Sequence, residues 1–380
     1  MSAGRQVSGR SIRLEGIVKR WGGTTALDGV SIDVPAGSFT ALLGPSGCGK
    51  STLLRIVAGL EAASGGRVLI GDEDVTRRPA DKRDLSMVFQ SYALFPHLTV
   101  AENIVFGLRT RGVKRAERED RLARVAELLG LTPYLGRKPA ALSGGQQQRV
   151  ALGRAVISER SICLMDEPLS NLDAKLRQTM RTELRALQRE LGFTMLYVTH
   201  DQVEAITMAD QVVLMNAGQV EQAAPPERLY ERPETTFAAR FIGTPPMNLL
   251  PASALGETGA ALERAAGREL MLGIRPEALR PATDGRLALH VTGAEYLGAD
   301  ALVQGQIGGA PAILRVPGHD MPGVAGGTIP LALAPQDLHL FDAESGRRVH
   351  LPDLVSLMAR SDVAGAEPGA HAPSFNQGNP

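Results

Sequence analysis

A short stretch near the N-terminus, GPSGCGKST, gathers glycines, a lysine and hydroxyl side chains at residues 44–52. It contains the pattern G-x-x-x-x-G-K-[ST], which runs from Gly44 to Ser51. Glycines allow a turn whose backbone N–H groups point at one anion, and the N-terminus of a following helix faces the same anion. Lys50 then brings positive charge to the outer phosphates of a nucleotide, and Ser51 brings a hydroxyl ligand for Mg²⁺. The alternative is an ordinary glycine-rich turn between a strand and a helix.

A pair of carboxylates follows an apolar run in ICLMDEP, residues 162–168. Asp166, at the end of a buried strand, is placed to hold the Mg²⁺ that Ser51 also contacts, directly or through water. Glu167, the next residue, is placed to polarise the water that attacks a γ-phosphate. The alternative is two solvated carboxylates after a strand.

A second glycine-rich turn occurs in LSGGQQQR, residues 142–149. Ser143, Gly144 and Gly145 expose backbone N–H groups before a helix, which suits a second contact with phosphate. One ATP site does not need two such turns far apart in the sequence. Two chains paired head-to-tail about a two-fold axis would give each turn the ATP of the other chain. The alternative is a flexible, glycine-rich start of a helix.

The elements that position these residues follow from hydrophobic periodicity. Helical periodicity extends from Val100 to Leu131, and Asp173 is placed to cap a later amphipathic helix. Beyond about residue 243, short strands separated by Gly/Pro turns predict a small β-rich second domain. Before it, apolar runs that alternate with helices predict a largely parallel α/β sheet. These runs are Phe39–Leu43, 84–90, 162–168 and 194–201.

Composition limits the classes of function. A chain of 380 residues suggests two or three domains. Lysine plus arginine and aspartate plus glutamate both number 41, and this balance argues against nucleic acid as the main partner. The two cysteines, Cys48 and Cys163, make no disulfide framework and fit a reducing compartment. The first residues lack the apolar core of a secretory signal, and no apolar run reaches the ~18 residues of a membrane span.

With these motifs in this order, the chain resembles the ATP-binding subunit of an ABC transporter over residues 11–354. The strand 162–167 is similar to the Walker B motif, Asp173 to the D-loop aspartate, Gln90 to the Q-loop glutamine and His200 to the switch histidine. Trp21 falls where the family places an aromatic ring on adenine, although tyrosine is commoner there and a core tryptophan is the alternative. The Walker A loop, which the resemblance implies to bind ATP, comprises Gly44, Pro45, Ser46, Gly47, Cys48, Gly49, Lys50, Ser51 and Thr52. The signature, implied to act on the ATP of the partner chain, comprises Leu142, Ser143, Gly144, Gly145 and Gln146.

The resemblance also implies chemical roles, domain boundaries and a fold. The implied fold is α/β, a P-loop ATPase domain of ABC type with a helical subdomain, followed by a small all-β, OB-like regulatory domain. The implied catalytic residues are Glu167, His200, Lys50 and Gln90. The implied Mg²⁺ ligands are Ser51, Gln90 and Asp166. The expected boundaries are a flexible tail at 1–10, the ATPase domain at 11–243, the regulatory domain at 244–354 and a disordered tail at 355–380.

Several features favour an importer over the other branches of this family. Exporters usually carry fused membrane helices, translation-type members two ATPase domains and repair-type members long coiled coils, and the sequence shows none of these. The β-rich extension resembles the regulatory domain of bacterial importer ATPases. IGTPPMNLLP and LGIRPEAL resemble the carbohydrate branch, especially the sn-glycerol-3-phosphate type. Importers of polyamines, sulfate or iron are alternatives, as is a soluble ABC ATPase that acts on nucleic acid or as a scaffold, while LSGGQ disfavours a P-loop kinase.

The importer resemblance implies partners and a location. The partners are a second copy in a head-to-tail dimer, two transmembrane permease subunits and, indirectly, a solute-binding protein, with no nucleic acid. The segment after Gln90, SYALFPHLTVAEN, would form a groove that receives a coupling helix from each membrane subunit. The expected location is the cytoplasmic face of the cell membrane, as a peripheral subunit.

Overall fold

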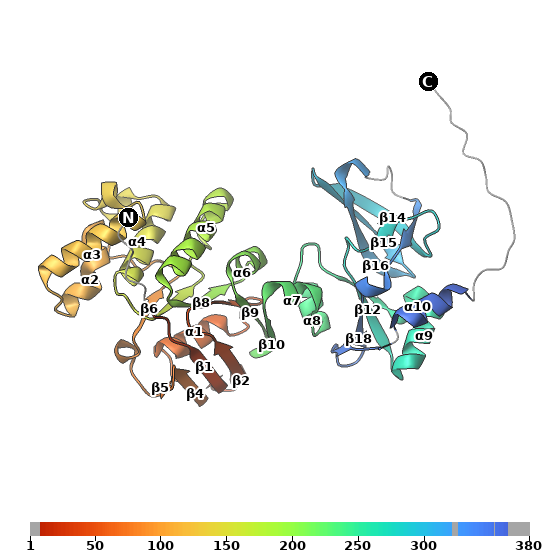
Figure 1. The fold of residues 1–380 in the computed structure, drawn as a ribbon, viewed down its shortest axis with the longest axis horizontal. Helices are drawn as coiled ribbons and strands as arrows, with labels where there is room; N and C mark the ends of the chain where they lie inside the picture. Colours follow the sequence, from red (N-terminus) through yellow and green to blue (C-terminus); the bar gives the residue numbers. More distant parts are fainter. Residues whose placement is uncertain (1–7, 321–325, 353, 364–380) are drawn as a thin grey trace, which may run out of the picture. The chain divides into compact units, whose positions relative to one another are not determined.

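The computed structural model describes residues 8–320, 326–352 and 354–363. It divides into two units, one that ends at Arg232 and one that begins at Pro233. Figure 1 shows the helices and strands of each unit. Within the described ranges, no helix combines the length and the apolar character that a bilayer crossing requires.

The first unit is built on a six-stranded sheet in the order β10-β9-β3-β8-β7-β6. The strands from β9 to β6 run parallel, and β10 is antiparallel to β9 at one edge. The central strands are fully buried, as expected where other layers cover both faces of a parallel sheet. The prediction of a largely parallel α/β sheet is therefore confirmed. The strands are β3 (Phe39–Leu43), β6 (Leu85–Val88), β7 (Ile162–Asp166), β8 (Thr194–Thr199), β9 (Gln211–Asn216) and β10 (Gln219–Ala224).

A four-stranded antiparallel sheet, in the order β2-β1-β4-β5, covers one face of the parallel sheet. Helix α1 (Lys50–Ala58) takes part in the same apolar core as both sheets, because its residues Leu53, Leu54 and Val57 are fully buried. The strands are β1 (Ile12–Trp21), β2 (Thr24–Val34), β4 (Gly65–Ile70) and β5 (Glu73–Asp74).

Helices cover the opposite face of the parallel sheet, and α2, α3 and α4 gather into the predicted helical subdomain (Figure 1). The predicted cap of α5 is confirmed, since Asp173 Oδ1 accepts a hydrogen bond of 2.9 Å from Leu176 N. The helices are α2 (Val100–Thr110), α3 (Arg115–Leu128), α4 (Gly144–Val156), α5 (Ala174–Leu191), α6 (Gln202–Met208) and α7 (Pro226–Glu231).

Side chains alternate between the two faces of the sheet, and this pleat decides where each functional residue lies. In β7, Leu164 faces the core that contains α1, whereas Met165 faces the helices on the other side. Asp166 shares the parity of Leu164, so it faces α1. In β8, Val198 faces α1 and Tyr197 faces the helical side.

The second unit has two antiparallel sheets around one core, in the orders β11-β12-β18-β19 and β13-β17-β14-β15-β16. Buried and exposed residues alternate along β15 and β16, as expected for strands with one solvated face. The predicted β-rich fold of this part is confirmed. The strands are β11 (Asn248–Pro251), β12 (Leu270–Ile274), β13 (Arg280–Pro281), β14 (Leu287–Tyr296), β15 (Asp300–Ile307), β16 (Ala310–Pro317), β17 (Thr328–Ala332), β18 (Leu338–Asp342) and β19 (Arg348–Val349).

The division between the units lies before the boundary at residue 243 that the change in sequence texture indicated. Helix α8 (Thr236–Phe241) belongs to the second unit, because Ala239 packs against Phe341 and the Arg275 guanidinium donates to Ile242 O. Helix α9 (Glu257–Ala266), which buries Leu262, was not predicted either. Both helices are short, so their periodicity is weak beside the Gly/Pro turns around them.

The described residues differ from the two expected tails at both ends of the chain. Arg10 Nη2 donates to Ile70 O at 2.6 Å, and Arg10 O accepts from Thr194 Oγ1 at 2.7 Å, so this residue is anchored. At the other end, Leu354–Val363 form helix α10, and Leu357 packs against the core of the second unit. Residues 1–7 and 364–380 of the expected tails lie outside the described residues.

His339, in β18, has a pKa well below the ordinary value for histidine. Arg348 Nη2 lies 2.6 Å from His339 Nδ1, which therefore acts as the acceptor. Burial lowers the pKa of His339 from 6.5 to about 4, and the charges of Arg348 and Arg275 add to this effect. Between these two pKa values the unfolded chain binds a proton that the folded chain does not, so stability falls as pH falls through this window.

We predict that His339→Asn, which keeps an acceptor for Arg348, flattens the pH dependence of unfolding of the second unit between pH 6.5 and about 4. One proton changes the slope by at most about 1.4 kcal/mol per pH unit. Thermal or urea unfolding of the full chain at several pH values measures it. His319→Asn is the control, because that side chain is 81% exposed. An unchanged slope in His339→Asn would contradict the prediction.

Candidate functional site

The predicted phosphate loop follows β3 directly and leads into α1. Gly49 has φ 100°, a left-handed conformation, and a Cβ there would lie 2.7 Å from Ala26 O. Glycine is therefore required at this position. Gly49 is also the N-cap of α1 and makes no side-chain capping bond, so the first N–H groups of the helix face the loop. The local structure is a helix N-terminus suited to an anion, as the sequence predicted.

Lys50 lies inside this loop. Its side chain is buried, and Nζ donates hydrogen bonds of 2.8 Å to Gly44 O and to Pro45 O. Nζ also lies 3.7 Å from Cys48 Sγ. The loop thus holds the ammonium group at its own centre, where it can exchange carbonyl oxygens for phosphate oxygens.

The carboxyl ends of three neighbouring strands meet beside the loop. In the parallel register Leu43 of β3 pairs with Thr199 of β8, and Val198 of β8 pairs with Asp166 of β7. Ser51 Oγ donates to Asp166 Oδ1 at 2.7 Å, which joins the first turn of α1 to the end of β7. A hydroxyl and a carboxylate that converge in this way are oxygen donors of the kind that Mg²⁺ prefers, so the residues fit the ion.

Glu167 adopts a backbone conformation that is unusual for its type. Its φ is 46°, in the left-handed region, which costs about 1–2 kcal/mol for a residue with a Cβ. Its N–H donates to Val198 O at 3.1 Å, and its Oε2 lies 3.1 Å from His200 Nδ1. With this backbone the carboxylate reaches His200 after the end of β8, so two of the four residues that were predicted to be catalytic meet.

Gln90 joins this group through a residue that sequence reasoning missed. Ser170 Oγ donates to Glu167 O at 2.9 Å and accepts from Gln90 Nε2 at 3.4 Å. Asn171 Nδ2 donates to Gln90 O at 3.2 Å. Ser170 and Asn171 therefore tie the loop after β6 to the turn after Glu167. The sequence SNLDA contains both residues, but nothing in its spacing indicated this partner.

The signature residues 142–146 make a different set of contacts. Ser143 and Gln146 form a capping box at the start of α4, each side chain bonded to the backbone of the other. A Cβ at Gly145 would lie 2.8 Å from the Leu176 side chain, so glycine lets α4 approach α5 closely. One hydrogen bond joins the phosphate loop to Asp166, and another joins Glu167 to His200. The signature instead packs on α5, the helix that Asp173 caps.

Trp21 lies at the end of β1 and is not a core residue. Its exposed fraction is 48%, which overturns the core alternative. Lys19 Nζ lies 5.0 Å from the centroid of the indole ring and is itself held by Glu61 Oε1 at 2.5 Å. A ring supported on one side and open on the other is suited to stack on a flat ligand.

A buried carboxylate on the helical side of the sheet was also missed. Glu204, in the first turn of α6, has an exposed fraction of 4%. Its Oε2 accepts hydrogen bonds from Tyr197 OH at 2.8 Å and from Thr199 Oγ1 at 2.7 Å. Burial raises the pKa of Glu204, while these hydroxyl groups oppose the rise. An acidic residue in the first turn of a helix usually faces solvent, so the sequence held no sign of this arrangement.

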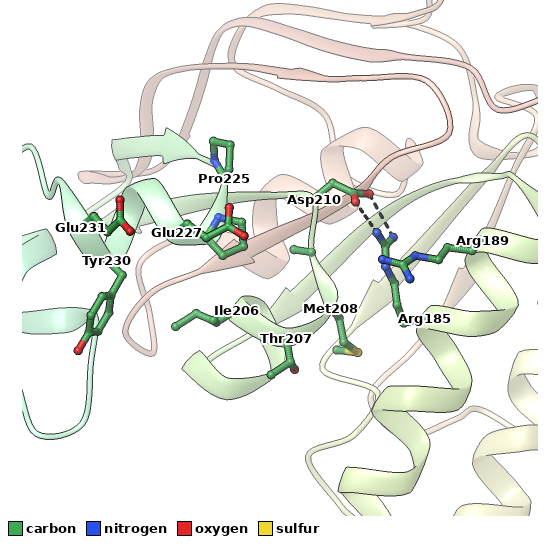
Figure 2. A pocket seen from close by; sticks show the side chains of 12 residues that line it. Arg185, Arg189, Ile206, Thr207, Met208, Asp210, Pro225, Glu227, Tyr230 and Glu231 are labelled. Carbon is green, nitrogen blue, oxygen red and sulfur yellow. Dashed lines mark hydrogen bonds and ion pairs between the residues drawn. The ribbon is translucent and has the colours of Figure 1, made fainter.

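A pocket of about 610 Å³ lies elsewhere in the first unit, along α5, α6 and α7 (Figure 2). Arg185 of α5 reaches Asp210 there, with Nη1 3.1 Å from Oδ2. None of the predicted site residues lines it. The lining residues are Arg185, Arg189, Ile206, Thr207, Met208, Ala209, Asp210, Pro225, Pro226, Glu227, Tyr230 and Glu231.

The fold and the residues at the sheet edge define a P-loop nucleotide hydrolase. Comparison with known proteins agrees, because residues 27–170 match the family model described as ABC transporter and residues 272–341 match the TOBE domain. A solved structure of cbiO1 from Clostridium perfringens, described as part of the ABC transporter complex cbiONQ, is similar with a TM-score of 0.54 and 28% identity. That similarity covers 57% of this chain and 89% of the other.

Curated relatives match over most of their length. A protein of Cereibacter sphaeroides called sn-glycerol-3-phosphate import ATP-binding protein UgpC is 49% identical over 347 residues. Proteins of the same name from Cupriavidus pinatubonensis and Ruegeria pomeroyi are 46% and 48% identical. Each of these three matches covers 89% of this chain and 99% of the relative. The chain belongs to the family of ABC transporter ATP-binding proteins, and it is an ATP hydrolase with a C-terminal TOBE domain.

We predict that a bulky thiol reagent on Cys48 blocks ATP binding and that bound ATP protects the thiol. Cys48 lies inside the phosphate loop with its Sγ near Lys50, so an added group would occupy the space of the phosphates. Cys48→Ser should bind ATP and resist the reagent. Cys163 is the internal control, because burial raises the pKa of its thiol to about 12 and keeps it unreactive. Mass spectrometry measures the labelling of each cysteine. Equal labelling of Cys48 with and without ATP would contradict this placement.

Proposed function

We propose that this chain energises a membrane importer for sn-glycerol 3-phosphate or a related carbohydrate-type solute. Two kinds of support meet in this proposal. The relatives with 46–49% identity are called import ATP-binding proteins for that solute, over nearly their full length. The residues IGTPPMNLLP and LGIRPEAL resemble the same branch. Importers of polyamines, sulfate or iron stay as the alternatives for the solute.

The observation that carries the proposed mechanism of hydrolysis is the meeting of two chemical groups at one sheet edge. The phosphate loop with Lys50 and Ser51 follows β3, and the pair Asp166–Glu167 follows β7. The Ser51–Asp166 hydrogen bond of 2.7 Å joins them. ATP phosphates in the loop would therefore lie beside the carboxylates that can assist their hydrolysis.

Each residue at this edge has a proposed role. Lys50 and the loop N–H groups bind the β- and γ-phosphates, and Ser51, Asp166 and Gln90 hold Mg²⁺, which neutralises phosphate charge when bound. Glu167 accepts the proton of the attacking water, and His200 steadies the carboxylate and donates to the γ-phosphate. Trp21 stacks on adenine. The remaining loop residues supply backbone contacts.

We predict that Glu167→Gln lowers ATP turnover by about 10²-fold or more and leaves ATP affinity unchanged. The amide keeps the size of the carboxylate and cannot accept a proton. Turnover is measured by phosphate release, and affinity by calorimetry with Mg·ATP. Retention of more than about a tenth of wild-type turnover would argue against a general base at Glu167.

Two copies are proposed to complete each site. Within one chain the signature turn packs on α5, and its capping box leaves the other N–H groups of the α4 N-terminus for a ligand. A head-to-tail dimer would bring that turn to the γ-phosphate bound by the second chain. Closure on two ATP molecules and reopening after hydrolysis would then drive the membrane partner.

We predict that Lys50→Ala and Ser143→Arg chains complement each other. In a mixed head-to-tail dimer, one site carries both lesions and the other carries neither. A one-to-one mixture should regain up to about a quarter of wild-type turnover, because half of the dimers keep one intact site. Each variant alone is the control. No recovery, with mixed dimers shown by tandem affinity tags, would contradict sites shared between chains.

The proposed partners are two transmembrane permease subunits at the cytoplasmic face of the cell membrane, with a solute-binding protein beyond them. The docking segment is the stretch after Gln90, where Tyr92 and Ala93 have positive φ. Arg154 of α4 holds this turn, with 2.7 Å bonds to the carbonyl oxygens of both residues. The second unit is proposed to regulate or to stabilise the dimer. Nucleic acid is not among the proposed partners.

The solute is tested with the reconstituted transporter. The chain is assembled in proteoliposomes with the permease subunits that co-purify with it and with their solute-binding protein. ATP turnover should rise several-fold with sn-glycerol 3-phosphate and not with a polyamine, sulfate or iron. Stimulation by one of those three alone would identify a different importer, while the assignment as an ATP hydrolase would stand.

A further inference from the structure

Arg177, in the first turns of α5, contacts two loops that surround the proposed site. Its Nη2 donates to Leu172 O at 3.0 Å, in the turn just before Asp173. Its Nη1 lies 3.5 Å from Asp201 Oδ2, the residue that follows His200. Its Nε is buried and lies 3.9 Å from Glu204 Oε1. One guanidinium therefore spans the D-loop and the loop that carries His200.

Glu204 makes the second half of this connection. One carboxylate oxygen accepts from Tyr197 OH and Thr199 Oγ1, and the other faces Arg177. Thr199 Oγ1 also accepts from Asp201 N at 3.0 Å, across His200. Glu204 is buried, so its charge depends on these few partners and breaking one of them is costly. The backbone on both sides of His200 is thereby fixed to α6 and to β8.

We infer that Arg177 and Glu204 are positioning residues that hold the His200 loop in register with the D-loop of the same chain. Neither is placed at the reacting atoms. They act by setting the contact between His200 Nδ1 and Glu167 Oε2, which is 3.1 Å in the structure. This inference rests on the proposed role of His200 in hydrolysis. It adds a link within one chain between the loop that carries Asp173 and the residue that contacts the Glu167 carboxylate.

The position of this link, on the helical side of the sheet, explains why it would affect the rate of hydrolysis and not the affinity for ATP. The phosphate loop and Lys50 are held by β3 and α1, on the other face of the sheet from Tyr197 and Glu204. Loss of Arg177 would leave that face unchanged and release the loop around His200. A shift of about 1 Å at a reacting group can cost up to about 10²-fold in rate. ATP binding should stay nearly constant while turnover falls.

The test is a double-mutant cycle between Arg177 and His200 in the full-length chain. Arg177→Met is made in the wild type and in His200→Ala, and hydrolysis of radiolabelled ATP is followed at steady state over a range of ATP concentrations, with long time courses so that slow rates are measurable. In the wild type we expect kcat to fall by about 10-fold to 100-fold with KM for ATP within about two-fold. In His200→Ala we expect less than about two-fold further loss, because the residue that Arg177 positions is absent.

Arg185→Met is the matched control. Arg185 lies two turns later on α5 and pairs with Asp210, after the far end of α6, so it also joins these two elements (Figure 2). It contacts neither the D-loop residues nor those around His200 among its described hydrogen bonds. Its loss should leave kcat within about two-fold of the wild type. A fall in kcat equal to that of Arg177→Met would show a general packing effect and overturn the inference.

Glu204→Gln provides a second route if Arg177→Met does not fold. The amide oxygen can still accept from Tyr197 and Thr199, while the amide NH₂ faces Arg177 without charge. We expect the same pattern of lower kcat and unchanged KM, and Arg177→Lys should recover part of the wild-type kcat because it keeps the charge. An equal loss from Arg177→Met in both His200 backgrounds would overturn the inference. Wild-type turnover in His200→Ala alone would instead overturn the role of His200 in the proposed function, and the inference with it.

Discussion

The register of three parallel strands is the constraint on which the site depends. Because β3, β8 and β7 pair side by side, Leu43, Thr199 and Asp166 end at one edge of the sheet. A chain that leaves each strand there must carry its next residues into the same space. The Ser51–Asp166 hydrogen bond closes this edge, since it joins α1 to the end of β7 at 2.7 Å. Slipping one strand by one residue would turn Asp166 to the other face.

The pleat of the same strands places the residues proposed for phosphate chemistry and the buried polar residues on opposite faces of the sheet. Asp166 has the parity that faces α1, where the phosphate loop lies. Tyr197 and Thr199 have the opposite parity and reach Glu204 on the helical side. The same two strands therefore carry residues for phosphate chemistry on one face and a buried polar network on the other. Such a network is stable where its polar groups are paired, as Tyr197 OH and Thr199 Oγ1 are with Glu204 Oε2.

Sequence reasoning identified the parts of the site that lie within short motifs. The phosphate loop, the Asp166–Glu167 pair and the Asp173 cap were each predicted from neighbouring residues, whereas the left-handed backbone of Glu167 was not. The missed residues depend on contacts that no motif spacing indicates, whether the partner is distant in the sequence, as for Ser170, or five and seven positions away, as for Glu204. Ser170 matters because Gln90, 80 positions earlier in the chain, reaches it, and Glu204 matters because β8 supplies its hydroxyl donors. Residues 236–241 precede the expected boundary at 243, yet Ala239 packs with Phe341, which comes much later in the chain and carries no local sequence signal for this contact.

The first turns of α5 contact the signature turn and the loop that carries His200. Asp173 caps the helix, Leu176 packs under the signature turn at Gly145, and Arg177 reaches Asp201 and Glu204, which follow His200 in the chain. A helix is a stiff element, so these contacts share one rigid support. In a head-to-tail dimer the signature would contact the nucleotide of the second chain, while His200 would contact that of its own chain. In that dimer, force on the signature from one ATP would act on the helix that also supports the switch loop of the other site, so α5 would be a physical route between the two proposed sites.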